Sequence, residues 1–209
     1  MVKKARSVTG IKKIGHAGTL DPFATGVLLI CIGKATKQVS ELQTLSKTYE
    51  AILKLGTGTD TLDLTGKIIK KEKIPNFKEE DLLRILKEFT GSIKQRIPDY
   101  SAAKVGGRRS YSLARKGKKL PERHKQVDIY RIELVSITSS EIHFSLDCST
   151  GTFVRTLGLD IATKLGTTGH LISLIRKSIG NYTLEDALTP EQFSGIWNTT
   201  TQDENIQKN

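Results

Sequence analysis

The residue best placed to do chemistry is Asp21, which stands alone in the loop GHAGTLDPFATGVL, residues 15–28. An aspartate before a proline commonly caps a turn, because its side chain bonds the local backbone and Pro22 fixes the next φ angle. Three glycines in this loop allow positive φ angles and a close approach to a ligand, and His16 adds a second polar side chain. The loop is therefore either a capped turn or the seat of a catalytic carboxylate.

A partner for this carboxylate is available in Arg155, in the segment GTFVRT at the expected start of a helix. A guanidinium can hold a carboxylate through two parallel hydrogen bonds and favour its ionised form. The glycine-rich segment 55–66 fits neither a dinucleotide fingerprint nor a calcium loop. The four histidines are scattered, without the spacing of a zinc site. We expect no metal and no cofactor.

The charge of the chain is uneven and indicates a polyanionic partner. The net charge is +11, and residues 94–125 hold eleven lysines and arginines against two acids, a local charge of +9. Like charges at this density repel one another unless an anion neutralises them. The sequence therefore predicts nucleic-acid binding that weakens steeply as salt is added.

The pattern of apolar residues predicts the elements that must position these side chains. The fold class expected is α+β, with a mixed, mostly antiparallel sheet flanked by helices and loops. Strands are expected at 26–33 (wholly apolar and buried), 47–56, 66–74 (an edge strand in a hairpin with 47–56), 127–137, 141–149 and 170–182. Helices are expected at 3–13, 34–45, 76–91 (with Asn76 as N-cap) and 152–166, with short helical pieces at 111–117, 183–188 and 189–193.

The length predicts one domain over residues 1–190, with a basic insertion at about 94–125, and a short polar tail at 191–209 whose last residues fray. No apolar stretch approaches the roughly 20 residues of a membrane helix, and no signal peptide is expected. Cys31 and Cys148 lie far apart in apolar surroundings, which is typical of reduced core residues in a cytoplasmic protein.

Five segments, in order along residues 10–185, resemble the conserved blocks of the TruB family, the tRNA pseudouridine-55 synthases. The blocks are KKIGHAGTLDPFATGVLLICIGKATK, KTYEAILKLGTGTDTLDLTG, PDYSAAKVGGRRSYSLARKG, CSTGTFVRTLGLDIATKLG and HLISLIRKSIGNY.

The resemblance implies that Asp21 is the catalytic aspartate of a pseudouridine synthase. The reaction breaks the C1′–N1 bond of a uridine, turns the uracil and rejoins it through C5, without metal or redox cofactor. Asp21 attacks C1′ or the base, or removes the 2′ proton, and the sequence does not choose among these routes. Arg155 is implied to pair with Asp21, and Tyr49 to stack on the flipped uracil and assist removal of the C5 proton.

The resemblance also implies which residues bind the RNA. His16 matches a histidine that fills the space left by the flipped nucleotide, although a loop-capping role is an alternative. Lys47 and Leu174 match further pocket positions, and Leu174 could equally be a core residue. Phe153 stands where the family usually has tyrosine, so that a hydroxyl hydrogen bond near the pocket is lost. The basic insertion is expected to clamp the T loop of tRNA, through residues that include Lys104, Arg108 and Tyr100, with Tyr111 also available for stacking.

Two further departures from the family pattern concern the ends of the chain. Family members begin with a strand that carries a Lys-Pro motif, whereas Met1 falls inside the helix that follows it, so either the start lies upstream or one sheet edge is unpaired. After about residue 190 there is no room for the C-terminal PUA-like domain of longer members. Reduced contact with the acceptor arm is expected.

The leading hypothesis is a monomeric, cytoplasmic enzyme that converts uridine-55 in the T-stem loop of tRNA to pseudouridine, with no membrane or metal partner. One alternative is a tRNA-binding or RNA-folding protein that has lost activity. A second alternative is a pseudouridine synthase that acts on another RNA.

Overall fold

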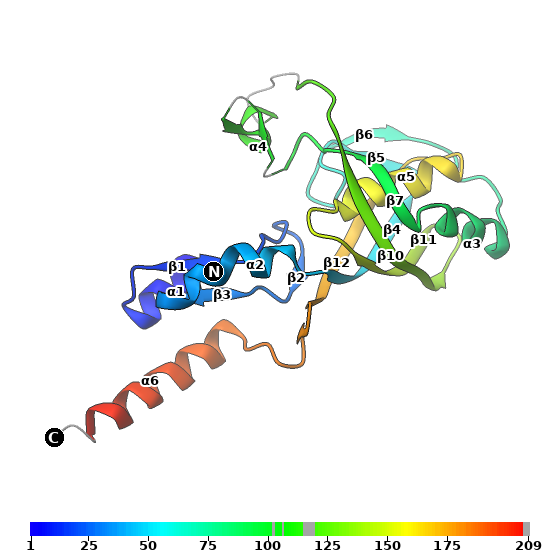
Figure 1. The fold of residues 1–209 in the computed structure, drawn as a ribbon. Coiled ribbons are helices and arrows are strands. Elements are labelled where there is room, and N and C mark those ends of the chain that lie inside the picture. The colour runs from blue at the N-terminus through cyan, green and yellow to red at the C-terminus, as the bar shows by residue number, and fades with distance from the viewer. Residues whose placement is uncertain (102, 106, 115–119, 207–209) are drawn as a thin grey trace.

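The computed structural model describes residues 1–101, 103–105, 107–114 and 120–206. Figure 1 shows a body built on one large sheet, with smaller units that project from it. The helices are α1 (Val2–Thr9), the 3-10 helix η1 (Gly33–Gln38), α2 (Val39–Thr44), α3 (Glu79–Glu88), α4 (Ser110–Ala114), α5 (Val154–Lys164) and α6 (Pro190–Ile206). The strands are β1 (Ile14–His16), β2 (Thr25–Gly26), β3 (Ile30–Ile32), β4 (Lys47–Leu55), β5 (Thr57–Thr59), β6 (Ile68–Lys71), β7 (Gly91–Arg96), β8 (Lys104–Val105), β9 (Arg108–Arg109), β10 (His124–Ile137), β11 (Glu141–Cys148), β12 (Gly169–Ile179) and β13 (Tyr182–Thr183).

The main sheet has seven strands in the order β13-β12-β4-β11-β10-β7, and β2 adds to β12. Every pairing in it is antiparallel except the parallel contact of β2 with β12. The expected α+β fold with a mixed, mostly antiparallel sheet is therefore confirmed. The central strand β4 alternates as predicted, because Ala51, Leu53 and Leu55 are all buried.

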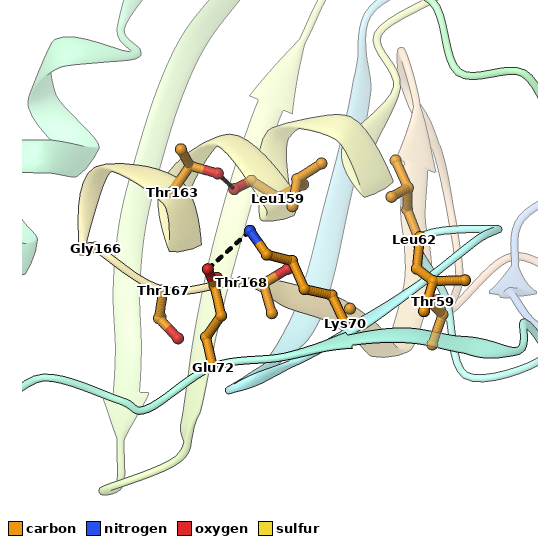
Figure 2. Close-up of a pocket in the computed structure, with 11 residues that line it drawn as sticks. Thr59, Leu62, Lys70, Glu72, Leu159, Thr163, Gly166, Thr167 and Thr168 are labelled. Carbon is orange, nitrogen blue, oxygen red and sulfur yellow. Dashed lines mark hydrogen bonds and ion pairs between the residues drawn. The ribbon is translucent and has the colours of Figure 1, made fainter.

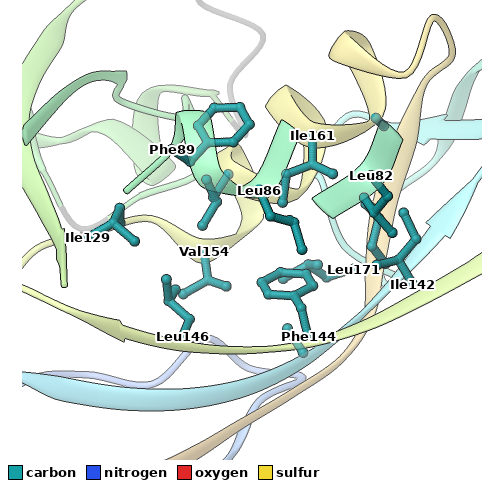
Figure 3. Close-up of a cluster of buried hydrophobic side chains, with 14 of the residues drawn as sticks. Leu82, Leu86, Phe89, Ile129, Ile142, Phe144, Leu146, Val154, Ile161 and Leu171 are labelled. Carbon is teal, nitrogen blue, oxygen red and sulfur yellow. The ribbon is translucent and has the colours of Figure 1, made fainter. Parts of the chain in front are cut away.

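The core lies where α3 and α5 cover one face of this sheet (Figure 3). Leu82 and Leu86 of α3 and Ile161 of α5 face Phe144 and Leu146 of β11. Helix α5 can approach the sheet closely because its fifth residue is glycine: a Cβ at Gly158 would lie 2.9 Å from the Leu171 side chain. This tight packing fixes the start of α5, which carries Arg155.

The apolar run 26–33 is not the single buried strand that its composition predicts. It contains two short strands that belong to different sheets, because β2 pairs with β12 and β3 pairs with β1. Gly26 makes the bend between them, with φ of +109° and the backbone of Arg176 against its Cα. The run therefore connects the main sheet to a small N-terminal lobe formed by α1, β1, β3, η1 and α2 (Figure 1).

Two further predictions on local structure need correction. Helix α3 begins at Glu79 rather than next to Asn76, because the Asp81 carboxylate accepts a hydrogen bond from the Lys78 amide at 3.2 Å and so caps the helix there. The strand expected at 66–74 covers only Ile68–Lys71 and pairs with β5 instead of β4. The chain turns at Gly56, so that β4 stays free to pair with β12.

The short helical piece expected at 189–193 is the start of a longer helix, which continues through most of the segment expected as a polar tail with frayed last residues. Helix α6 extends from Pro190 to Ile206 and begins with a capping box, in which Thr189 and Gln192 exchange side chain–backbone hydrogen bonds at 2.8 and 3.2 Å. An ion pair between Lys4 and Glu191 joins it to α1. Among the helices that the structure describes, none has the length and apolar character of a membrane span. Cys31 and Cys148 are buried free thiols, as predicted.

Candidate active site

Asp21 lies in the loop between β1 and β2, at the junction of the N-terminal lobe and the main sheet. Its backbone carbonyl accepts a hydrogen bond from the Ala24 amide at 3.0 Å, which closes the turn expected at the Asp-Pro pair. Its carboxylate does not cap that turn. Instead it reaches Arg155, which is 134 residues away in the sequence.

Arg155 holds Asp21 through the two parallel hydrogen bonds that were predicted. Nε donates to Oδ2 at 2.8 Å and Nη2 donates to Oδ1 at 3.0 Å. The remaining donors bind the backbone carbonyls of Thr61 at 2.6 Å and Tyr100 at 2.8 Å. The Arg155 side chain is 5% exposed and that of Asp21 is 35% exposed, so the guanidinium is fixed inside the protein while the carboxylate meets a cavity.

A second carboxylate, Asp63, completes this network from the opposite side. Its Oδ2 lies 3.5 Å from Nη1 of Arg155, and both side chains are 5% exposed. Its Oδ1 accepts hydrogen bonds from the Thr61 hydroxyl and from the Thr65 amide and hydroxyl, at 2.6 to 2.9 Å. A buried charge needs such partners. Leu62 between them adopts a positive φ of +64°, which presents the Thr61 carbonyl and the Asp63 side chain to Arg155 together.

The loop that carries Asp21 is held at both ends by Arg176 of β12. This guanidinium belongs to a residue that is only 2% exposed, and it donates to the carbonyls of Val27 at 2.7 Å and of Thr19 and Gly18 at 3.3 Å. The Arg176 carbonyl in turn accepts from the Val27 amide at 2.9 Å. A buried arginine thus fixes the loop through backbone groups, independently of the Asp21 side chain.

A cavity of about 420 Å³ lies over Asp21 and Arg155, within the size range of small-ligand sites. Tyr49 and Leu174 line it from β4 and β12, and Phe153 lines it from the turn before α5. Burial raises the pKa of the Tyr49 phenol, an effect that the charge of Arg176 and a hydrogen bond to it partly offset. Six predicted residues therefore share one cavity: Asp21, Lys47, Tyr49, Phe153, Arg155 and Leu174.

Lys47 and Phe153 take structural contacts that the sequence did not predict. The Lys47 ammonium donates to the carbonyls of Gln43 at 2.7 Å and Leu45 at 2.5 Å, at the end of α2. Burial and then the charge of Arg176 lower its pKa. The backbone of Phe153 exchanges two hydrogen bonds with the Gln95 side chain, at 2.7 and 3.1 Å, which fixes the turn that leads to Arg155.

The other predicted residues lie outside this set of cavity-lining residues. His16 is on β1, and its buried Nδ1 has no hydrogen-bond partner among the described residues. Tyr100 contributes its backbone carbonyl to Arg155. Lys104 and Arg108 belong to the hairpin formed by β8 and β9, and their side chains lie outside the part of the chain that is described.

Sequence reasoning missed Asp63, Arg176 and Gln95. Asp63 lies in the segment 55–66, which was tested as a dinucleotide fingerprint and as a calcium loop and was matched to a family block without a role for this residue. Arg176 follows the apolar run HLISLI within the strand expected at 170–182, and a lone arginine there is a signal for a buried, multiply bonded guanidinium. Gln95 gives no comparable signal. Among the described residues, no group of three or more histidines, cysteines or acids lies close enough to hold a metal ion.

A second cavity, of about 440 Å³, lies behind the Thr61–Asp63 segment and shares no lining residue with the first (Figure 2). Leu62 and Thr59 line one side of it, α5 and the turn after α5 line another, and the ion pair between Lys70 and Glu72 spans 2.7 Å beside it. It holds none of the predicted site residues. The Asp21 cavity is therefore the candidate active site.

Comparison with known proteins identifies a family over most of the chain. The model of the TruB family pseudouridylate synthase, N-terminal domain, matches residues 6–154. A tRNA pseudouridine synthase B of Bacillus pumilus is 41% identical over 98% of this chain and 68% of that protein. Proteins of the same name from Clostridium tetani and Bordetella avium are 39% and 43% identical, over 100% and 93% of this chain and 69% and 81% of theirs.

Solved structures share the fold. A chain in the crystal structure of a Cbf5–Nop10–Gar1 complex superimposes with a TM-score of 0.66 at 28% identity, over 87% of this chain and 45% of that chain. A chain in the structure of an H/ACA RNP bound to a substrate RNA containing 2′-deoxyuridine has a TM-score of 0.71 at 24% identity, over 97% and 50%. The present chain thus spans half or less of these two solved chains.

Proposed function

This chain belongs to the TruB family of pseudouridylate synthases, and from that premise we propose that it converts a uridine of tRNA to pseudouridine with Asp21 as the catalytic residue. The observation that carries the assignment is the position of the Asp21 carboxylate. Both of its oxygens accept hydrogen bonds from the buried guanidinium of Arg155, and the carboxylate lines a cavity of about 420 Å³. A reacting group must be both fixed and accessible, and this aspartate is both.

The reaction is an isomerisation, so that its atoms balance without a co-reactant. The C1′–N1 bond breaks, C1′ forms a bond to C5, the C5 proton leaves and N1 gains a proton. Asp21 acts on the ribose or the base as nucleophile, or as base at C2′. Arg155 orients its two oxygens, and Asp63 and the Thr61 carbonyl hold Arg155 in turn.

The remaining cavity residues suit a base that has been flipped out of an RNA loop. A flipped base is held by stacking and by hydrogen bonds to its edge. Tyr49 offers a ring and a phenol whose raised pKa keeps it protonated at neutral pH, and Leu174 adds an apolar contact on the next strand. Phe153 lacks the hydroxyl of a tyrosine but retains the ring.

We assign the T-stem loop of tRNA, and uridine-55 within it, as the substrate. The basic insertion at 94–125 supports this, because it carries a net charge of +9 and its residues Ile97, Ser101, Ala103 and Lys125 line the cavity. Its lysines and arginines contact phosphates, with Lys104 and Arg108 among them, and Tyr100 and Tyr111 add contacts to the loop. The protein acts as a monomer, in the cytoplasm where this substrate lies.

Mapping of pseudouridine in an unmodified tRNA transcript tests this proposal. Incubation with the protein followed by carbodiimide treatment and primer extension should give one new stop, immediately 3′ of position 55. A transcript with cytidine at that position should give none. Stops at other positions or only in other RNAs would contradict the substrate, and tight tRNA binding with no stop at all would support the alternative of an RNA-folding protein.

A further inference from the structure

The first forty residues carry a second concentration of positive charge, separate from the basic insertion. They contain seven lysines and arginines and one acid, which is Asp21 itself, a net charge of +6. All seven basic side chains are exposed. Because the whole chain has a charge of +11 and the insertion a charge of +9, the remainder outside both regions is negative. The charge of the N-terminal lobe is therefore a local feature.

The fold gathers four of these lysines, from two segments of the sequence, at one end of the β1–β3 ribbon. Lys12 and Lys13 precede β1, and Lys34 and Lys37 lie in η1, which follows β3. The Gly33 amide donates to the Lys13 carbonyl at 2.8 Å, so that the two segments are adjacent. Residues three apart in a 3-10 helix share a face, which places Lys34 and Lys37 on the same side. We call these four residues the N-terminal basic surface.

The N-terminal basic surface has no neutralising partner within the protein. None of its four lysines forms an ion pair or a side-chain hydrogen bond with another described residue, whereas Lys4 on the nearby α1 pairs with Glu191. Close, unpaired charges of one sign destabilise the compact state. An anion that binds from outside would neutralise them.

The N-terminal basic surface is connected to the candidate active site through β1 and the loop that follows it. Lys13 is three residues before His16 on the same ribbon, which is about 10 Å at the rise of a β-strand. The ribbon continues into the loop 18–21, which lines the Asp21 cavity from one side. Ile97, Ser101 and Ala103, at the base of the basic insertion, line the same cavity. Figure 1 shows the lobe and the β8–β9 hairpin projecting from the same side of the main sheet.

We propose that the N-terminal basic surface binds the phosphate backbone of the double-stranded stem next to the substrate loop, so that the RNA lies between two cationic regions of the protein. This inference rests on the proposed function. Lysines bind phosphates as point charges and read no sequence. The lobe offers no exposed aromatic residue for stacking on unpaired bases, because Phe23 is its only aromatic residue and is partly buried. Met1 is the only exposed large apolar residue between positions 1 and 63, and a single such residue disfavours insertion into a lipid surface.

The test compares two variants with the same change of charge. One replaces Lys12, Lys13, Lys34 and Lys37 with glutamine. The control replaces Lys67, Lys71, Lys73 and Lys87, which are also exposed and lack ion pairs with described residues, but lie on and near β6 and α3, outside the lining of the cavity. Circular dichroism and thermal unfolding should be unchanged in both, because all eight side chains lie on the surface.

The measurement is the dissociation constant for a T-arm stem-loop RNA at several salt concentrations. Each phosphate contact contributes about 0.9 to the slope of log K against log salt. If each of the four lysines contacts one phosphate, the N-terminal variant should lose about 3.6 units of slope and bind more than about tenfold more weakly at 0.1 M salt, whereas the control keeps the wild-type slope. Affinity for the loop nucleotides without the stem should be the same in all three proteins.

Equal slopes for the two variants would overturn the proposal, as would an equal loss of affinity for the stemless oligonucleotide. Binding of wild type, but not of the N-terminal variant, to phosphatidylserine vesicles, with an unchanged RNA slope, would show a membrane site instead. The proposed function is read separately, from pseudouridine formed by the wild-type protein. A wild type that isomerises tRNA while the slope is unaffected leaves the function standing and refutes this surface. If the wild-type protein is inactive but the N-terminal variant loses slope, the proposed function is refuted and the RNA-binding role of this surface stands.

Discussion

Replacement of Arg155 by lysine tests the network that positions Asp21, because it keeps the positive charge and removes the planar fork. Arg155 makes four hydrogen bonds, two to Asp21 and one each to the carbonyls of Thr61 and Tyr100. A lysine ammonium has three donors on one atom and cannot reproduce two parallel bonds to a carboxylate while it reaches both carbonyls. At least two of the four bonds are therefore lost.

The magnitude follows from the burial of the two partners. Hydrogen bonds to charged groups contribute about 1.5–3 kcal/mol each, so that two lost bonds would cost about 3–6 kcal/mol in a fully dry site. Asp21 is 35% exposed and regains water, so we expect a decrease of about 2–4 kcal/mol in the free energy of unfolding. For a chain of this length the melting temperature should fall by about 4–16 °C.

The rate of pseudouridine formation should fall as well. A displacement of about 1 Å in a reacting group can lower a rate about 10²-fold, and we expect at least that loss in single-turnover pseudouridine formation by Arg155→Lys. The matched control is Arg131→Lys, because Arg131 pairs with Glu133 and Asp147 on the surface and is 62% exposed. The control should match wild type in both assays. An Arg155→Lys protein with wild-type turnover and melting temperature would refute the positioning role of Arg155.

Three other changes have defined outcomes. Tyr49→Phe retains the aromatic ring and loses the hydroxyl, so RNA affinity should be unchanged while turnover falls about 10²-fold or more. Because burial raises the pKa of Tyr49, the rate of the wild-type protein should show no change with pH, at or below pH 10, that comes from ionisation of this group. Gly26→Ala should lower the free energy of unfolding, measured by thermal denaturation, by about 3–5 kcal/mol. The reason is that the φ angle of Gly26 is +109° and a Cβ there would lie 2.2 Å from the Arg176 carbonyl oxygen. Gly195→Ala is the control and should leave the free energy of unfolding unchanged, because a Cβ at Gly195 meets open space. Burial raises the pKa of Asp160 to about 6, above its unfolded value, so its contribution to stability is fully present below about pH 4 and is lost as the pH rises through 6; Asp160→Asn should therefore raise the melting temperature at pH 7, by up to about 2 kcal/mol in free energy, and the difference should vanish in acid.

Local patterns in the sequence were sufficient to predict those strands in which the alternation of apolar residues matches the alternation of buried and exposed positions in the sheet. The alternation at 47–56 gave β4, and the two runs at 127–137 and 141–149 gave the β10–β11 hairpin. The C-terminal segment, in contrast, was predicted as a polar tail and forms the helix α6. The capping signal at 189–192 predicted the start of a helix there, but the polar composition that follows gave no sign that this helix extends to Ile206.

The candidate site depended on contacts that no local pattern encodes. Resemblance to a family supplied the pairing of Asp21 with Arg155, and the geometry bears that contact out. Asp63 and Arg176 were missed because a charged residue is buried only when distant groups satisfy it. The partners of Arg176 are up to 158 residues away in the sequence, and Asp63 meets Arg155 only after α5 packs on the sheet.

The most direct test of the account is the release of tritium from tRNA labelled at uridine C5, measured for wild type and for Asp21→Asn in single-turnover conditions. Asparagine matches the shape of aspartate but carries no charge and cannot act as nucleophile or base. We predict release by wild type, at least about a 10³-fold slower release by Asp21→Asn, and equal tRNA affinity for both. Release by Asp21→Asn within tenfold of wild type would contradict the claim that this carboxylate performs the reaction.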